Sequence, residues 1–545
     1  MNRGYRMRES SFVIARAFAV TVAASVVLLQ PTLGAVDAGG RRGGRDFSPA
    51  TANVPNDEAA VTHALNRLAF GARPGDVQRV QKIGLATWIE QQLNPEAIRD
   101  DSVQARLNRL TTLDLDPQTI AEEYIRPARE ERRRRLLAAP ANGTDSPEMN
   151  EQMAGSARPA TGSGGASAPP PAADPLPESL RRARQVIGDL SEAKIIRAVY
   201  SERQLEEVLV DFWFNHFNVF ARKGRTELYV GEYEREAIRP HVLGKFRDLL
   251  EATAKSPAML FYLDNWMSAD PSMEPMRPGS RRLFQGAPAR QTQQQQQQRG
   301  PRGLNENYAR ELLELHTLGV DGGYTQDDVI AVARAFTGWT IAPMQRSGFR
   351  FVPAMHDRKE KRVLGHVIPA GGGIDDGQRV LDILADHPST AKHIAFQLAQ
   401  RFVSDTPPAA IVDRAAARFR ETKGDLREVV RTIVTSPEFY AREARAAKVK
   451  TPFEFAVSAL RVTGADITLA LPIARALATM GMPLYLCQPP TGYGETADAW
   501  LSSGALVNRI NFALELAGNR LRGARIEAGG ADFARMLGSP EFQRQ

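Results

Sequence analysis

The sequence predicts an all-α protein: one large multi-helix domain with a small β-hairpin insert and two disordered low-complexity loops. Apolar residues recur at helical spacing in most segments, as with Val61, Leu65 and Leu68. Helix-start signals are frequent, whereas a single stretch, 348–369, is strand-like. With 545 residues and 43% hydrophobic content, the chain has enough apolar material for one large or two ordinary domains.

The first residues have the pattern of an export signal. Four arginines precede an apolar run at 17–29, and Pro31 and several small residues follow it. The run is too short for a comfortable membrane span and has the flanks of a secretory signal. We therefore expect residues 1–35 to be a signal peptide, cleaved between Gly34 and Ala38, and the protein to be exported to the periplasm or the outside. An uncleaved N-terminal anchor is the alternative.

Composition divides the rest of the chain into helical parts and low-complexity stretches. Pro, Ala, Gly and Ser dominate one stretch and a glutamine tract marks another, and neither can form a packed core. No segment after the signal is long and apolar enough to cross a bilayer. The predicted order is a disordered segment (36–55), the N-terminal helical part of the core (56–138), a Pro/Ala/Gly linker or loop (139–177), a helical core segment (178–268), a Gln-rich disordered insert (269–303) and the continued helical core (304–545).

Three helices are predicted in the N-terminal part. The first covers residues 57–70, and a Gly-rich turn follows it. The second begins at Asp76 and ends before Asn94-Pro95, because the residue before a proline disfavours helix. The third covers residues 117–138.

The C-terminal part is predicted to be helical again, with one β excursion. Thr325 and Thr451 each precede an acidic residue at the spacing of a capping box, in which side chain and backbone satisfy each other at the helix start. The stretch 348–369 is expected to form a β-hairpin with Asp357, Arg358 and Lys359 near its tip.

Charge and cysteine content exclude some classes of protein. The formal charge is +7, and removing the signal, with its four arginines and one glutamate, leaves about +4. Both signs are interspersed and no basic-aromatic stripe occurs, so nucleic acid is not expected as a partner. A single cysteine, Cys487, precludes an intramolecular disulfide. Its surroundings favour an inert buried thiol over a nucleophile, since no histidine lies nearby in sequence.

The segment 205–220 separates into an apolar face and a polar face when drawn as a helix. His216 falls on the apolar face, where a histidine is more often a core residue than a ligand. The two faces are Leu209, Phe212, Trp213, His216 and Phe220 on one side, and Glu207, Asp211, Asn215 and Asn218 on the other.

The segment 304–339 begins with a polar cluster that spans about three helical turns: Asn305, Glu306, Asn307, Arg310, Glu311, Glu314 and His316. One helical stripe holds Asn307, Arg310, Glu311 and Glu314, whereas His316 follows the other. A solvated helix seldom needs an asparagine such as Asn307, because asparagine is a weak helix former. Glu311 and His316 are five residues apart and do not share a face, so the segment is not a zinc helix of the His-Glu-x-x-His type.

Other motifs are weaker. Asp264, between Leu263 and Asn265, is placed near aromatic residues and is expected either to line a pocket or to cap a turn. Three or four of the eight histidines, with Glu311 or Asp264, could converge on a metal, although their spacing neither supports nor forbids it. No EF-hand, phosphate loop, Rossmann fingerprint or nucleophile elbow occurs. The sequence therefore identifies no cofactor.

A set of longer motifs resembles a known family. They are DFWFNHFNVF (211–220), the run 241–266, LNENYARELLELHTLGVDGGYTQDDV (304–329), AFTGW (335–339), KVKTPFEF (448–455), GMPLYLCQPPTGY (481–493) and GSPEFQR (538–544). Together they are similar to the bacterial domain-of-unknown-function family 1800, from about Ala60 onward. The resemblance implies an exported or envelope-associated helical protein, often encoded next to sulfatase-like proteins of the family numbered 1501. It implies no activity and no catalytic residues.

Two functional hypotheses follow. In the first, the exported protein has a polar ligand-binding or catalytic site in its helical core, in one version that of a metal-dependent hydrolase. His216, His316 and Glu311 are the expected catalytic residues of that site, and its expected ligand-binding residues are Asn215, Asp264, Asn307 and Arg310. In the second, the protein is a non-catalytic scaffold or accessory subunit of an exported partner such as a sulfatase-like protein. A site requires these polar groups to converge in a pocket, whereas a scaffold requires an exposed apolar patch.

Overall fold

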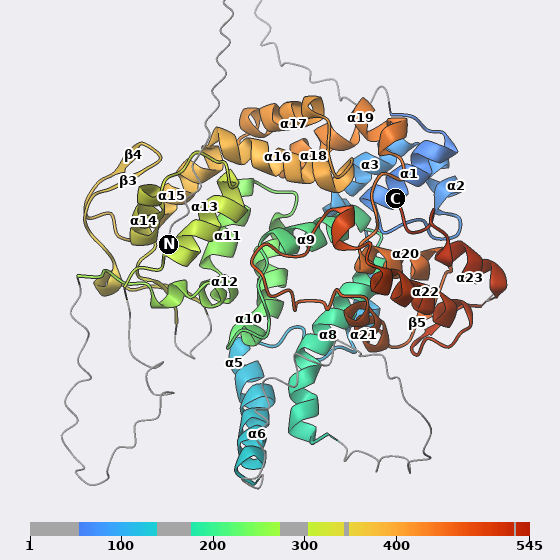
Figure 1. The fold of residues 1–545 in the computed structure, drawn as a ribbon, viewed down its shortest axis with the longest axis horizontal. Coiled ribbons are helices and arrows are strands. Elements are labelled where there is room, and N and C mark those ends of the chain that lie inside the picture. Colours follow the sequence, from blue (N-terminus) through green and yellow to red (C-terminus); the bar gives the residue numbers. More distant parts are fainter. Residues whose placement is uncertain (1–53, 139–175, 273–302, 343–347, 528–529) are drawn as a thin grey trace, which may run out of the picture. The chain divides into compact units, whose positions relative to one another are not determined.

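The computed structural model describes residues 54–138, 176–272, 303–342, 348–527 and 530–545. The predicted signal peptide (1–35) lies outside the described residues, as do nearly all of the disordered segment (36–55), the linker (139–177) and the Gln-rich insert (269–303). The described residues belong to one unit, Ala50–Gln545, and are mainly helical (Figure 1). This confirms the predicted all-α fold class.

The N-terminal part contains short helices followed by one longer helical run. Gly84, with φ +89°, separates two helices where a single one is predicted between Asp76 and Asn94. Glycine tolerates this backbone angle because it has no Cβ. The elements are α1 (Glu58–Leu68), α2 (Asp76–Ile83), α3 (Leu85–Gln92), a 3₁₀ turn (Pro95–Ala97), α4 (Asp101–Leu107), α5 (Pro117–Thr119), a π-helical turn (Ile120–Ile125) and α6 (Arg126–Ala138).

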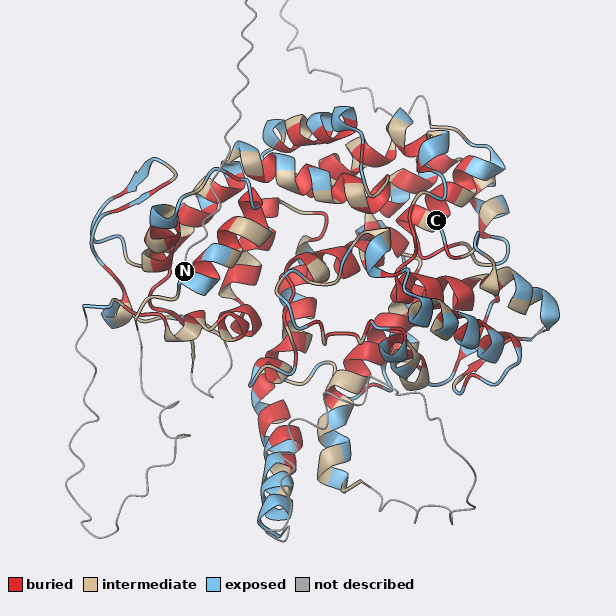
Figure 2. Cartoon of the chain, in the orientation of Figure 1, coloured by how far each residue is buried: buried red, intermediate tan, exposed pale blue. Residues whose placement is uncertain are grey.

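The central part lies in the middle of the view in Figure 1, where α8 and α9 lead into α10. Figure 2 shows α9 buried along nearly its whole length, whereas the first turns of α8 are exposed. The elements are α8 (Glu178–Tyr200), α9 (Gln204–His216), α10 (Thr226–Glu232), the π-helical turn η4 (Tyr233–Ile238), a 3₁₀ turn (Arg239–His241), α11 (Phe246–Lys255), α12 (Pro257–Tyr262) and a 3₁₀ turn (Asn265–Met267).

The remaining helices begin at the capping signals seen in the sequence. Thr325 and Thr451 each form a complete capping box, with Asp328 and Glu454 as the reciprocal acids. The elements are α13 (Glu306–Leu313), the π-helical turn η8 (Glu314–Leu318), α14 (Gln326–Ala335), α15 (Ile374–Asp386), α16 (Pro388–Phe402), α17 (Ala409–Glu421), α18 (Leu426–Val434), α19 (Pro437–Tyr440), a 3₁₀ turn (Arg442–Ala444), α20 (Pro452–Val462), α21 (Leu471–Thr479), a 3₁₀ turn (Ala497–Ala499), α22 (Ser503–Ala517) and α23 (Ala531–Gly538).

The strands differ from the predicted hairpin. Instead of one hairpin over 348–369 there are two, and the region around Asp357 is a connection between them rather than a tip. Pro353 begins a 3₁₀ turn that ends the first hairpin, because proline cannot donate to a strand ladder. The antiparallel pairs are β1 (Trp339–Ile341) with β2 (Phe349–Phe351), β3 (Lys361–Val363) with β4 (His366–Ile368), and β5 (Asp466–Ile467) with β6 (Ala524–Arg525).

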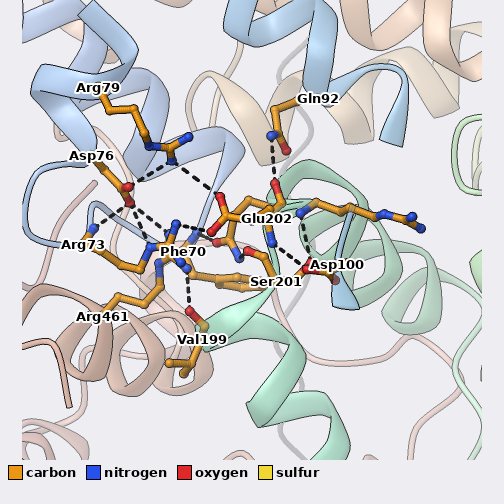
Figure 3. A network of polar contacts seen from close by, with 12 residues as sticks. Phe70, Arg73, Asp76, Arg79, Gln92, Asp100, Val199, Ser201, Glu202 and Arg461 are labelled. Atoms are coloured by element: carbon orange, nitrogen blue, oxygen red, sulfur yellow. Dashed lines mark hydrogen bonds and ion pairs between the residues drawn. The ribbon is translucent and has the colours of Figure 1, made fainter. Parts of the chain in front are cut away.

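One polar junction joins the N-terminal helices to the α8–α9 connection and to α20, and Figure 3 shows it with three arginines around Asp76. Arg73 and Arg79 bind the Asp76 carboxylate at 3.3 and 2.9 Å, and Arg461 of α20 approaches it to 3.5 Å. Glu202, between α8 and α9, accepts from Arg73 at 2.7 Å. We call these five residues the Asp76 junction. Burial alone would raise the pKa of Asp76, but the hydrogen bond from the Arg73 N–H and the arginine charges lower it.

None of the helices in the described residues is both long and apolar enough to cross a membrane.

Candidate functional site

A small cavity, about 30 Å³, lies between α9 and the loop at 482–495. Helices α8 and α16 and the start of α20 supply the rest of its wall. The side chains that line it are mostly polar or aromatic, and several are charged. They include Lys194, Asp211, Asn215, Asn218, Arg401, Tyr485, Cys487, Tyr493 and Glu495.

The polar face of α9 forms one wall of this cavity. The sequence places Asp211, Asn215 and Asn218 together on that face, and in the structure Asp211 and Asn218 are buried and Asn215 is half-buried. A helix with one apolar and one polar face commonly turns the polar face to water. Here the polar face packs against other polar groups, so both faces of α9 contribute to the interior.

The loop at 482–495 is fixed to α9 by reciprocal hydrogen bonds. The Tyr493 N–H donates to Asn215 Oδ1 at 2.7 Å, and Asn215 Nδ2 donates to the Tyr493 carbonyl at 2.9 Å. Asn218 Nδ2 donates to the carbonyls of Cys487 and Pro489, at 3.1 and 2.7 Å. Both asparagines therefore hold the loop over the cavity.

Gly492 lets the loop approach α9 closely. Its φ is +71°, and a Cβ at this position would lie 2.4 Å from the Asn215 carbonyl oxygen. Two reasons therefore favour glycine at this position. Any other residue would have a strained backbone, and its Cβ would collide with α9.

The charges around the cavity form a chain of ion pairs. Lys194 Nζ lies 2.8 Å from Asp211 Oδ1, and Arg401 Nη2 lies 3.9 Å from the other oxygen of Asp211. Arg401 also binds Glu454 at 2.8 Å and approaches Glu495 at 3.5 Å. Burial alone would lower the pKa of Arg401, but these three carboxylates raise it, Glu454 most. Arg401 therefore stays charged.

Glu495 is the least satisfied member of this chain. Its Oε2 is buried and makes no hydrogen bond within the described residues, and its one ion pair, with Arg401 Nη1, is 3.5 Å long. Burial raises the pKa of Glu495, and the charges of Arg401 and Lys448 only partly offset that effect. Buried polar atoms are nearly always hydrogen-bonded in folded proteins, so an acceptor without a partner beside a cavity is a candidate binding group.

The predicted catalytic histidines meet in a second cluster, outside the residues that line the cavity. The rings of His216 and His316 lie 6.3 Å apart, and His216 Nε2 is 3.2 Å from the His316 carbonyl oxygen. Gln397 bridges His216 Nδ1, at 2.6 Å, and His393 Nε2, at 3.0 Å. Burial lowers the pKa of His216 to about 4 and that of His316 to about 3. Both rings are therefore neutral at pH 7.

The other predicted site residues lie on or near the surface. Asn307 and Arg310 are exposed on α13, and Arg310 donates to Gln326 at 2.8 Å. Glu311 is half-buried, and burial and the charge of Glu314 raise its pKa. Asp264, with φ +61°, pairs with a lysine side chain at 2.7 Å. The structure thus brings His216 and His316 together and places Asn215 at the cavity, but it does not gather the seven residues into one site.

We find no group of side chains arranged to bind a metal ion in the part of the chain that the structure describes. No three His, Cys, Asp or Glu side chains there are placed to hold a metal ion. Cys487 lines the cavity, but burial raises the pKa of its thiol to about 11, so the unreactive protonated form predominates at neutral pH.

Sequence reasoning missed the charged partners of the cavity: Lys194, Arg401 and Glu495. These residues lie in other segments of the chain than α9, so no local sequence pattern indicates that they contact it. One signal was present, because the rigid, aromatic stretch 483–493 indicates a loop with a defined conformation. Asn215 of α9 and Asn218, two residues after its end, are the groups that hold this loop.

Comparison with known proteins identifies the family. The family model described as "Protein of unknown function (DUF1800)" matches residues 63–544, which is most of the chain. No curated protein and no solved structure gives a significant match. The chain belongs to the DUF1800 family, as the motifs of the sequence predict.

Proposed function

We propose that this DUF1800 protein is exported and binds a small polar ligand in the cavity between α9 and residues 482–495. Glu495 accepts a hydrogen bond from a donor group of the ligand, an ammonium or a hydroxyl. The observation that carries the proposal is the buried Glu495 Oε2 at this cavity, which makes no hydrogen bond within the described residues and has only the 3.5 Å ion pair with Arg401 Nη1. Export rests on the signal pattern of residues 1–35.

The chemistry of the cavity supports a donor rather than an acceptor as the entering group. The cations beside it are already engaged, Lys194 by Asp211 and Arg401 by Glu454. The unused capacity belongs to a carboxylate oxygen. Aromatic side chains of Tyr485 and Tyr493 line the same space and fit the apolar part of a small amine.

Binding is favoured over metal-dependent hydrolysis by the positions of the histidines. A hydrolase of that kind needs ligands converging on an open site. His216 and His316 are buried beside aromatic rings instead, and His216 has both ring nitrogens within hydrogen-bond distance of other groups.

The test uses a defined set of probes. The mature protein is titrated with ammonium, methylammonium and ethanolamine while its thermal unfolding is followed, and any stabilising probe is confirmed by calorimetry. We expect at least one of these amines to stabilise the protein and Glu495→Gln to weaken that binding by roughly tenfold or more, as for a lost hydrogen bond to a charged group.

The matched control is Glu130→Gln, which removes an exposed carboxylate on α6. It should leave probe binding unchanged. If no probe stabilises the wild-type protein, or if both variants respond alike, the cavity is not the proposed site.

The accessory-subunit hypothesis has one observation in its favour. Val507, Ile510 and Leu514 are 44–55% exposed and lie at helical spacing on α22. Exposed aliphatic side chains that recur on one helix face fit a docking surface. An exported sulfatase-like protein is the partner that the family resemblance implies. Ile510→Ser with Leu514→Ser should abolish co-purification with that partner while leaving probe binding intact.

A further inference from the structure

A second, larger cavity of about 260 Å³ lies where α4 and the segment after it meet α8 and the turn η4. Three arginines line it, Arg197 from α8 and Arg235 and Arg239 from the η4 region. Neutral polar side chains such as Asn108 add further hydrogen-bonding groups to the wall. The residues proposed to bind the polar ligand form a different cavity.

The three arginines differ in how far their donors are used. Arg239 is fully engaged, because its Nη1 and Nη2 donate to both oxygens of Glu207 at 2.7 and 3.0 Å. Arg235 donates to the Leu113 carbonyl at 2.5 Å and to Glu236 at 3.0 Å. These two arginines are held in place by the protein.

Arg197 is the exception. Its guanidinium makes no side-chain hydrogen bond within the described part of the chain, and its one ion pair, to Glu234 Oε1, is 4.0 Å long. The side chain is nevertheless only 23% exposed. A guanidinium carries five N–H donors in a planar fork that matches an oxyanion, so a largely buried Arg197 leaves strong donors available at this cavity.

Two carboxylates also line the cavity, Asp114 and Glu234. Asp114 is exposed, where solvent screens its charge. Burial alone would raise the pKa of Glu234, yet Lys194, Arg239 and Arg197 hold it below its ordinary value. These cations therefore keep Glu234 ionised, and of the three arginines at the cavity Arg197 has the longest ion pair, 4.0 Å.

We propose that this cavity binds an oxyanionic group, a carboxylate, sulfate or phosphate, with the Arg197 guanidinium as its principal donor and Arg235 as its second cation. The anion occupies the donors of Arg197 that no protein group uses. Arg239 contributes only its charge, because both of its Nη groups already donate to Glu207.

The site adjoins the polar-ligand cavity through one hydrogen bond. Glu234, which lines the anion cavity, accepts from the Tyr485 hydroxyl at 2.6 Å, and Tyr485 lines the polar-ligand cavity. The proposal of an anion site depends only on the residues of its own cavity. It does not require the polar-ligand cavity to bind anything.

The experiment compares anions at equal ionic strength. Thermal unfolding of the mature protein is measured in sodium sulfate, phosphate and acetate against sodium chloride, and affinities are measured by calorimetry. We expect at least one oxyanion to stabilise the wild-type protein beyond chloride and Arg197→Gln to weaken its binding by roughly tenfold to a hundredfold. The anion that binds best identifies the class of group the site takes.

Two further variants make the result specific. Arg184→Gln removes an exposed arginine of the same helix, α8, and should bind anions like the wild type. Arg197→Lys keeps the charge but loses the planar fork, and it should fall between the wild type and Arg197→Gln. No oxyanion effect beyond chloride, or equal losses in Arg184→Gln and Arg197→Gln, would overturn the proposal.

Discussion

The Asp76 junction and the cavity beside Glu495 are both built from buried charges, but they differ in completeness. In the junction, Asp76 receives two arginines within 3.3 Å and a third at 3.5 Å. Beside the cavity, Glu495 Oε2 makes no hydrogen bond in the described structure, and its ion pair with Arg401 is 3.5 Å long. Opposite pKa directions follow, lowered for Asp76 and raised for Glu495.

This difference separates structural charges from available ones. A buried carboxylate whose acceptors are all occupied stabilises the fold, and removing a partner costs free energy. A buried carboxylate with an unused acceptor is destabilising in the free protein, and binding of a donor relieves that cost. Substitutions at Arg461 and Glu495 test whether the two regions behave in these opposite ways, and two further substitutions test the loop over the cavity and the neighbouring histidine cluster.

The largest effect is expected at the junction. Arg461 Nε donates to the Gly71 carbonyl at 2.8 Å and Nη1 to the Val199 carbonyl at 2.7 Å, while Nη2 lies near Asp76. Arg461→Met removes all three contacts and should lower the free energy of unfolding by about 3–5 kcal/mol. Thermal and urea unfolding measure it. Arg79→Met is the control, and its 47% exposed side chain predicts a loss below about 1 kcal/mol.

The next largest effect is expected at the loop that covers the cavity. Gly492→Ala adds a Cβ 2.4 Å from the Asn215 carbonyl oxygen at a φ of +71°, so strain and collision combine to about 2–4 kcal/mol. Gly481→Ala is the matched control, because its φ is +94° but nothing lies within 4 Å. It should lose only the strain, about 1–2 kcal/mol. Equal losses of unfolding free energy in both variants would show that the loop does not press on α9.

A pH-dependent effect is expected in the histidine cluster. The folded pKa of His316, about 3, lies below the ordinary value of 6.5, so the unfolded chain binds the extra proton first. Stability is therefore lost as the pH falls from 6.5 toward 3. His316→Leu removes this contribution, about 2 kcal/mol by pH 5. Unfolding of the variant should thus depend less steeply on pH than that of the wild type.

The smallest effect, and one of opposite sign to the first, is expected at Glu495. Because its folded pKa is raised, the native state keeps a proton that the unfolded chain has released, and stability falls as the pH rises above about 4.5. Glu495→Gln removes that loss, so relative to the wild type it should gain stability between pH 5 and pH 8. If Glu495→Gln is instead strongly destabilised at pH 8, the Glu495 carboxylate stabilises the fold, as Asp76 does, and the expectation is wrong.

The fold could be predicted to a large extent because its signals are local. Helical periodicity and the capping boxes at Thr325 and Thr451 depend on residues within one or two turns, and the structure confirms both caps. The pairing of strands over 348–369 was wrong, since β2 pairs with residues of β1 before that stretch. The sequence of a strand does not specify its partner.

The cavity could be predicted only in part. Asn215 and the polar face of α9 are visible in the sequence, but whether that face meets water or other charges depends on distant segments. Arg401 and Glu495 also line the cavity, but they lie 190 and 284 residues after Asp211 in the sequence. No local pattern encodes such a contact.

The junction around Asp76 has a consequence for how this chain acquires its structure. The hydrogen bond from Arg461 to Gly71 joins residues 390 positions apart. Contacts of such long range form slowly, because the loop-closure entropy is lost before the contact stabilises anything. The N-terminal helices are also synthesised long before α20, which can dock on them only afterwards. A chain that crosses a membrane unfolded would complete this junction only after most of it has emerged on the far side.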